Sequence, residues 1–122
     1  MTSAAAGSCW IGRAQPTLIP SRTSEAASRP GLHAASLPWL HERGVAVIAS
    51  DASQDCTPSG YSFSPIHSVG CVAMGLCLLD ACQFDDLLSE CNARARWEFM
   101  CVIAPWRWRN ATASPVTPLA VL

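Results

Sequence analysis

The alternation of apolar and polar positions predicts short helices and strands that follow one another along the chain. Ser36 can cap a short helix that has Pro38 in its first turn and stops at Gly44. The β-branched run Val45–Ser50 predicts a buried strand. Residues 51–65 contain proline and glycine at close intervals and predict a loop.

The next apolar segment, residues 64–88, has two interpretations that place its polar residues differently. His67 lies near its start, Asp80 interrupts it, and Gly75 lies between them. In a single helix these two side chains would lie about 20 Å apart along the axis, on different faces, and could not share a metal ion. A reversal at Gly75 would instead return a strand that brings Asp80 toward His67. Met, Leu, Ala and Cys are not strong strand formers, so periodicity alone favours the single helix.

The C-terminal third of the chain predicts one helix and two strands. Residues 84–95 repeat apolar side chains at the spacing of one helix face. Residues 97–105 are mostly apolar and end at a proline, which predicts a strand, and the tail ends in a further short strand. Helices and strands therefore alternate, which indicates a mixed α and β class, α/β or α+β.

The first 30 residues differ in composition from the rest of the chain. They are rich in Ala, Ser, Arg and Pro, and Pro16, Pro20 and Pro30 interrupt any helix. We predict a loose or disordered arm over residues 1–30 and an ordered domain over residues 31–122.

Composition and charge exclude some classes of partner. Half of the residues are hydrophobic, 14% are charged, and the formal net charge is -1. This balance gives no electrostatic footprint for nucleic acid or for an anionic membrane. The longest apolar stretch, residues 69–79, is shorter than the roughly 20 residues of a membrane-spanning helix, which predicts a soluble protein.

The seven cysteines do not form a recognisable disulfide or metal pattern. Their number is odd, no Cys-x-x-Cys pair occurs, and the N-terminus lacks the features of a signal peptide. We therefore expect reduced thiols and a cytoplasmic location.

Short catalytic motifs are absent. His41 and Glu42 begin like a zinc-protease motif, but the second histidine is missing. The segment Trp-Arg-Trp-Arg at residues 106–109 could stack nucleobases, although a loop in which Arg packs on Trp agrees better with the net charge. No Gly-x-Ser-x-Gly nucleophile motif or phosphate-binding glycine loop is present, so no residue is assigned as catalytic or as binding an organic cofactor.

Three blocks, taken together, resemble the C-terminal part of the cyclase family. This family includes kynurenine formamidase (arylformamidase) and related metal-dependent amide and lactone hydrolases. The resemblance covers about residues 31–122. The blocks are GLHAASLPWLHERGVAVIASDASQD, SPIHSVGCVAMGLCLLDACQFDDLL and RWEFMCVIAPWRWRNATASPVTPLAVL.

The resemblance implies the reversal at Gly75 and a metal site. In the family, a helix that carries a histidine is followed by a glycine and a strand that bears a carboxylate, commonly Glu. This chain has His67 and Asp80 at the matching places, so both are expected metal ligands. The implied ion is a divalent metal, Zn or Mn, and the implied fold is a swivelling β/β/α domain that is incomplete here.

The chain also departs from the family pattern. Its tail is similar to the segment Gly-Thr-Gly-Ser-Pro-Val-Asn-Pro, but Ala111 and Ala113 replace glycines and Thr117 replaces Asn. The main upstream motif, His-x-Gly-Thr-His-x-Asp, does not occur. A zinc site needs three or four ligands, and only two are expected here. We therefore predict a C-terminal fragment that is inactive alone. The metal belongs to the complete family site, and this chain alone is expected to lack it.

The predicted function is that of a fragment of a metal-dependent hydrolase. By resemblance, the complete enzyme acts on a small-molecule formamide, amide or lactone, as in the catabolism of tryptophan to kynurenine. An unpaired sheet edge predicts a homo-oligomer or pairing with a complementary chain. Two alternatives stay open, namely a non-catalytic interaction module and a truncated relic that does not fold.

Overall fold

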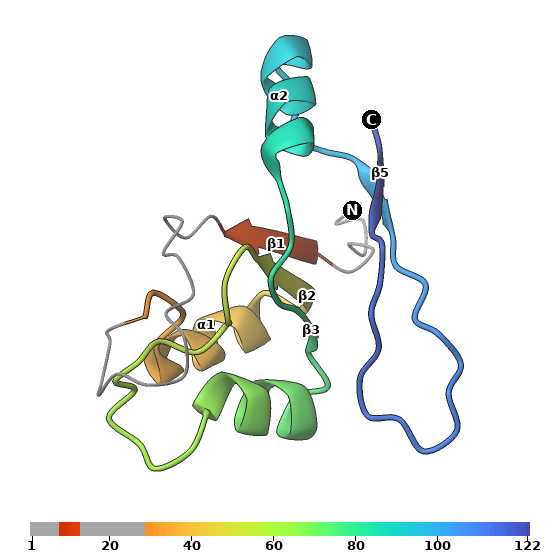
Figure 1. Ribbon diagram of the computed structural model, residues 1–122. Coiled ribbons are helices and arrows are strands. Elements are labelled where there is room, and N and C mark those ends of the chain that lie inside the picture. The colour runs from red at the N-terminus through yellow and green to blue at the C-terminus, as the bar shows by residue number, and fades with distance from the viewer. Residues whose placement is uncertain (1–7, 13–28) are drawn as a thin grey trace, which may run out of the picture. The chain divides into compact units, whose positions relative to one another are not determined.

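The computed structural model describes residues 8–12 and 29–122. The chain forms two compact units, Met1–Gln83 and Phe84–Leu122, which are described separately below. Figure 1 shows that the first unit contains a small sheet with helices and that the second contains a helix and a two-stranded ribbon.

The first unit is built on a three-stranded parallel sheet with the strand order β1-β2-β3. The central strand β2 (Val45–Ser50) pairs with β1 (Ser8–Gly12) on one side and β3 (Cys77–Leu79) on the other. Its run of β-branched residues suits a central position, where both neighbours exclude water. The predicted strand Val45–Ser50 is confirmed.

Two short helical segments precede the central strand of this sheet. A short 3₁₀ turn, η1 (Ala34–Ser36), leads directly into α1 (Leu37–Glu42), which has a proline in its first turn. The chain leaves α1 at Gly44, whose φ of 60° is a conformation that glycine adopts without strain. The helix predicted between Ser36 and Gly44 is therefore confirmed. The predicted side-chain cap is wrong, because the hydroxyl of Ser36 donates to the carbonyl of His33 at 2.8 Å and makes no capping hydrogen bond.

The core of the first unit lies between these helices and the sheet. It consists of buried aliphatic side chains from α1, β2, η2 (Ile66–Ala73) and the segment after η2. These are Leu37, Leu40, Ile48, Ile66 and Leu76.

A reversal at Gly75 separates η2 from β3. The helix η2 has π-type hydrogen bonding, and the N–H of Leu76 donates to the carbonyl of Gly70 at 2.9 Å just after it ends. Gly75 has φ of 70°, which lets the chain turn back so that β3 runs parallel to β2. The single helix favoured by periodicity is therefore wrong, and the reversal implied by the family resemblance is confirmed.

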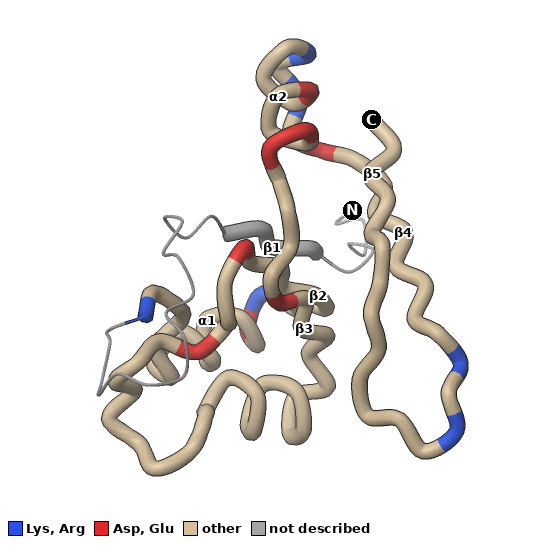
Figure 2. Tube along the Cα trace, in the orientation of Figure 1, with Lys and Arg blue, Asp and Glu red and all other residues tan. Residues whose placement is uncertain are grey.

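The second unit contains α2 (Asp85–Arg94) and an antiparallel ribbon of β4 (Met100–Val102) and β5 (Leu119–Val121). Asp85 and Asp86 lie in the first turn of α2 and Arg94 lies in its last turn (Figure 2). Charges of these signs at these ends interact favourably with the helix dipole and stabilise the helix. Ala95, with φ of 47°, ends the helix. The predicted helix and both predicted strands occur, and both strands are short.

The mixed α and β class is confirmed, whereas the swivelling β/β/α layering stays a prediction. Within the predicted arm of residues 1–30, strand β1 occupies residues 8–12. Residues 1–7 and 13–28 of that arm lie outside the described part of the chain. Among the helices that the structure describes, none combines the length and the apolar character needed to cross a membrane.

Candidate functional site

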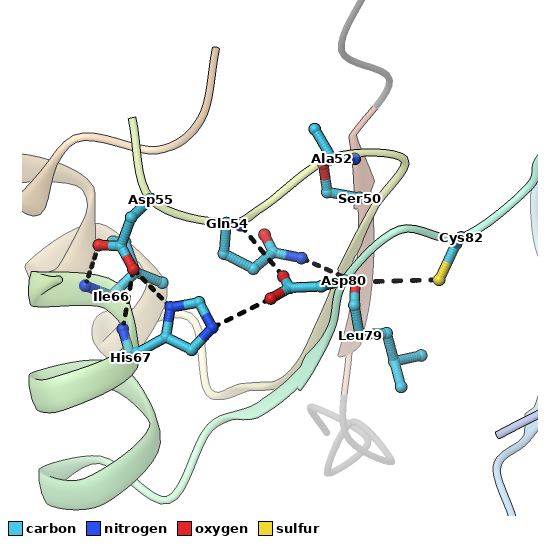
Figure 3. A network of polar contacts seen from close by, with 9 residues as sticks. All are labelled: Ser50, Ala52, Gln54, Asp55, Ile66, His67, Leu79, Asp80 and Cys82. Carbon is cyan, nitrogen blue, oxygen red and sulfur yellow. Dashed lines mark hydrogen bonds and ion pairs between the residues drawn. The ribbon is translucent and has the colours of Figure 1, made fainter. Parts of the chain in front are cut away.

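Polar side chains gather where two parallel strands of the first unit end. Residues 51–55 follow the carboxyl end of β2, and Asp80 follows the last residue of β3. Because parallel strands end at the same edge of a sheet, this edge is where open α/β sheets commonly place their ligand sites. The start of η2, with His67, lies beside the same two loops (Figure 3).

The imidazole of His67 lies between two carboxylates (Figure 3). Its Nδ1 is 2.5 Å from Oδ2 of Asp55, and its Nε2 is 3.0 Å from Oδ2 of Asp80. The side chains of His67 and Asp80 are 42% and 38% exposed, whereas that of Asp55 is 7% exposed. The ring is therefore anchored on a buried acid and presents its other nitrogen at the surface.

Asp55 also holds the first turn of η2. Its Oδ1 accepts the backbone N–H of Ile66 at 2.7 Å, and its Oδ2 accepts that of His67 at 3.3 Å. These N–H groups have no partner within a helix, and a carboxylate at this end favours the helix dipole. One buried carboxylate thus fixes both the backbone and the ring of His67.

Asp80 is held through its other oxygen. Its Oδ1 accepts the backbone N–H of Gln54 at 3.1 Å, which leaves Oδ2 directed at His67. The side-chain Nε2 of Gln54 donates to the carbonyl of Leu79 at 2.9 Å. The backbone before Asp80 and the carboxylate itself are therefore both held by one residue.

The hydrogen bonds define the protonation of His67. Asp55 and Asp80 as carboxylates can only accept, so Nδ1 donates to Asp55, and Nε2 donates to Asp80 while it is protonated. A metal ion bound at Nε2 would replace that second proton. Partial burial lowers the pKa of His67, but the hydrogen bond to Asp55 and the negative charge of Asp80 outweigh it, and the net result is a raised pKa. In the metal-free chain, a second proton on Nε2 can balance the two carboxylates.

This arrangement predicts a pH-dependent stability in the absence of metal. The folded-state pKa of His67 lies above its ordinary value of 6.5, so its contribution is fully present below that value. The contribution is lost as the pH rises through the folded-state pKa. Urea unfolding in EDTA between pH 5.5 and 9 should therefore show a decline that His67→Asn removes and that His41→Asn, on the exposed surface of α1, retains. Parallel profiles for the wild type and His67→Asn would contradict this.

The donor set of the site fits a divalent metal ion in part. Imidazole nitrogen and carboxylate oxygen are ordinary ligands of Zn and Mn. Nε2 of His67 and Oδ2 of Asp80 lie 3.0 Å apart, at hydrogen-bond distance. A carboxylate on the far nitrogen of a histidine is also the usual support of a metal-ligating imidazole. Within residues 8–12 and 29–122, however, no group of three or more His, Cys, Asp or Glu is arranged to hold a metal ion.

The structure brings together the two residues that the sequence singled out, His67 and Asp80, and their role as metal ligands stays a prediction. Asp55 was missed, because the residues predict only a loop there. Its place shortly after a buried strand was the available signal. His33 is used differently, since its Nδ1 accepts the N–H of Ala35 at 3.2 Å, and His41 lies exposed on α1.

A comparison with solved structures finds a protein with a similar fold. The fold is similar to a protein described as a novel cyclase from its crystal structure, with a TM-score of 0.69 and 25% sequence identity. The similarity covers 78% of this chain and 31% of that protein. Neither the family models nor the curated proteins gave a match.

This likeness supports the resemblance to the cyclase family. The TM-score of 0.69 indicates a shared fold, and the aligned region covers most of this chain. The chain spans less than a third of the length of the similar protein.

Proposed function

We propose that this chain is part of a metal-dependent hydrolase of the cyclase type, which cleaves a formamide, amide or lactone. The observation that carries this proposal is the geometry of His67. Its Nδ1 is fixed by a buried carboxylate, and its Nε2 lies 3.0 Å from a half-exposed carboxylate oxygen at the carboxyl ends of parallel strands. The similarity to a novel cyclase supports the same class.

In this proposal, each residue of the site has one task. His67 and Asp80 supply a nitrogen and an oxygen donor to a divalent metal, Zn or Mn. Asp55 keeps the proton on Nδ1 and the lone pair on Nε2, which is the form of imidazole that binds a metal. The metal, when bound, would polarise a carbonyl and lower the pKa of a bound water.

Two donors are fewer than the three or four protein ligands typical of zinc sites. We therefore propose that the remaining ligands and the general base come from a polypeptide segment outside this sequence, and that the chain alone is inactive. Hydrolysis of N-formylkynurenine, the arylformamidase substrate suggested by the family resemblance, is the specific activity proposed for the complete enzyme. Metal-dependent hydrolysis of this substrate by the purified chain would refute the need for further ligands.

The proposed metal site is tested by calorimetric titration of the chain with ZnCl₂ and MnCl₂. We expect saturable binding that Asp80→Asn weakens by at least about 10-fold, because an amide oxygen replaces an anionic ligand. Glu90→Gln is the matched control. It removes another half-exposed carboxylate, which forms an ion pair with Arg94 on α2, and it should leave the affinity unchanged. Equal affinities for the wild type and Asp80→Asn would contradict the proposal.

A second candidate function is an interaction module, and one observation in the second unit favours it. The β4–β5 ribbon pairs Met100 with Val121 and Val102 with Leu119, and these four side chains are 41–61% exposed. Their positions alternate along both strands, so they share one face of the ribbon. A two-stranded ribbon is only marginally stable by itself, and an apolar partner would stabilise it. A concentration-dependent dimer that binds no metal, measured by analytical ultracentrifugation, would favour this candidate.

A further inference from the structure

Two adjacent residues, Gln54 and Asp55, are the buried polar or charged side chains among the described residues. Gln54 is 2% exposed and Asp55 is 6% exposed. Burial of a polar side chain is costly unless its hydrogen bonds are made. Both residues make theirs toward the candidate site, which indicates that their burial serves the arrangement of that site.

Gln54 holds the Asp80 side of the site at two points. Its side-chain amide donates to the carbonyl of Leu79 at 2.9 Å, and its backbone N–H donates to Oδ1 of Asp80 at 3.1 Å. The first contact fixes the end of β3, and the second fixes the rotation of the carboxylate. As a result, Oδ2 of Asp80 is the oxygen that faces His67 (Figure 3).

Asp55, the next residue in the chain, holds both the backbone N–H and the ring of His67. The separation between Nε2 of His67 and Oδ2 of Asp80 is therefore set by one short stretch of backbone, Gln54–Asp55. We infer that Gln54 is a positioning residue for the site, which acts on metal binding through Asp80 without touching the ion. This inference rests on the proposed function for its consequence in metal binding, and on the hydrogen bonds alone for the placement of Asp80.

The first test compares metal affinities in folded proteins. Gln54→Met keeps the length of the side chain but removes the bond to Leu79, and we expect an affinity about 10- to 100-fold lower, as for other supporting residues of metal ligands. Ile48→Val is the matched control, because it weakens the core beside the sheet without altering these hydrogen bonds. Unchanged affinity in Gln54→Met, with both variants folded by circular dichroism, would overturn the inference.

A double-mutant cycle separates positioning from a general structural effect. If Gln54 acts through Asp80, the loss caused by Gln54→Met should be much smaller when Asp80 is already replaced by Asn. Additive losses would mean that Gln54 affects binding by another route, and the inference would fail.

Amide hydrogen exchange tests the placement of Asp80 without any metal. The backbone N–H of residue 54 is protected by Oδ1 of Asp80, so Gln54→Met should accelerate its exchange by at least about 10-fold while the exchange of the Ile48 amide in β2 stays unchanged. Acceleration in a chain that binds no metal would uphold the positioning role and refute the proposed metal site. Equal exchange rates in wild type and variant would overturn the positioning role itself.

Discussion

Asp55→Ala is expected to lower the free energy of unfolding by about 2–4 kcal/mol, the largest effect of any polar substitution at the site. The carboxylate accepts the N–H groups of Ile66 and His67 and binds the ring of His67, and its removal leaves these donors without their acceptor. The estimate stays below that for a fully buried ion pair because His67 is 42% exposed and water can solvate its ring. Urea unfolding at pH 7 in EDTA measures the change.

Asp55→Asn separates the two tasks of this side chain. An amide oxygen can still accept the N–H of Ile66, so we expect a smaller loss of stability. With the amide oxygen on Ile66, the NH₂ group takes the place of Oδ2, so the backbone N–H of His67 loses its acceptor. The NH₂ group would donate to Nδ1 of His67, which favours the tautomer with its proton on Nε2 and blocks the nitrogen proposed to bind metal. We expect metal affinity at least about 10-fold below that of the wild type. A stable Asp55→Ala chain, or an Asp55→Asn chain with wild-type affinity, would contradict this assignment.

Gly31→Ala is expected to destabilise the first unit, because the backbone packs closely against this glycine. A Cβ at this position would lie about 2.4 Å from the carbonyl carbon of Asp55 and 2.5 Å from the nitrogen of Cys56. Both atoms belong to the backbone, so a rotamer change cannot relieve the contact. The segment that carries Asp55 would have to move, and overpacking of this kind costs about 1–3 kcal/mol.

Gly70→Ala provides the matched control for this prediction. A Cβ at Gly70 would meet the side-chain Cδ2 of Leu37 at 3.2 Å, which is the end of a flexible side chain. Alanine also has the higher helix propensity, which offsets part of any repacking cost. Thermal unfolding should therefore show a clearly larger loss of Tm for Gly31→Ala than for Gly70→Ala. Equal or reversed losses would show that the approach of Gly31 to Asp55 is not a tight one.

Local pattern predicted the elements that depend on local chemistry. Val45–Ser50 is β-branched and central in its sheet, and α1 lies between a proline in its first turn and Gly44, so both were predictable. The break at Gly75 was not predictable from periodicity, because the apolar residues on both sides suit a buried helix as well as a strand. Pairing with β2 decides the outcome, and that contact is between residues distant in the chain.

The site was predictable only as far as the family resemblance reached. The resemblance identified His67 and Asp80, and the structure places Nε2 of His67 3.0 Å from Oδ2 of Asp80. Asp55 and Gln54 lie in a segment with no periodic pattern, and their importance comes from contacts with residues 11–26 positions away in the sequence. Nothing in the composition of that segment distinguishes an acid that supports a histidine from an acid exposed to solvent.

The most direct test of the metal site is ¹⁵N NMR of the histidine side chains during titration with ZnCl₂. The signals of His67 are assigned by their loss in His67→Asn, which separates them from those of His33 and His41. We predict that Nδ1 of His67 keeps its proton throughout and that Nε2 alone shifts to the range of a metal-bound nitrogen. An Nε2 signal that zinc does not change, or binding through Nδ1, would contradict the central claim that Asp55 prepares His67 to bind a metal beside Asp80.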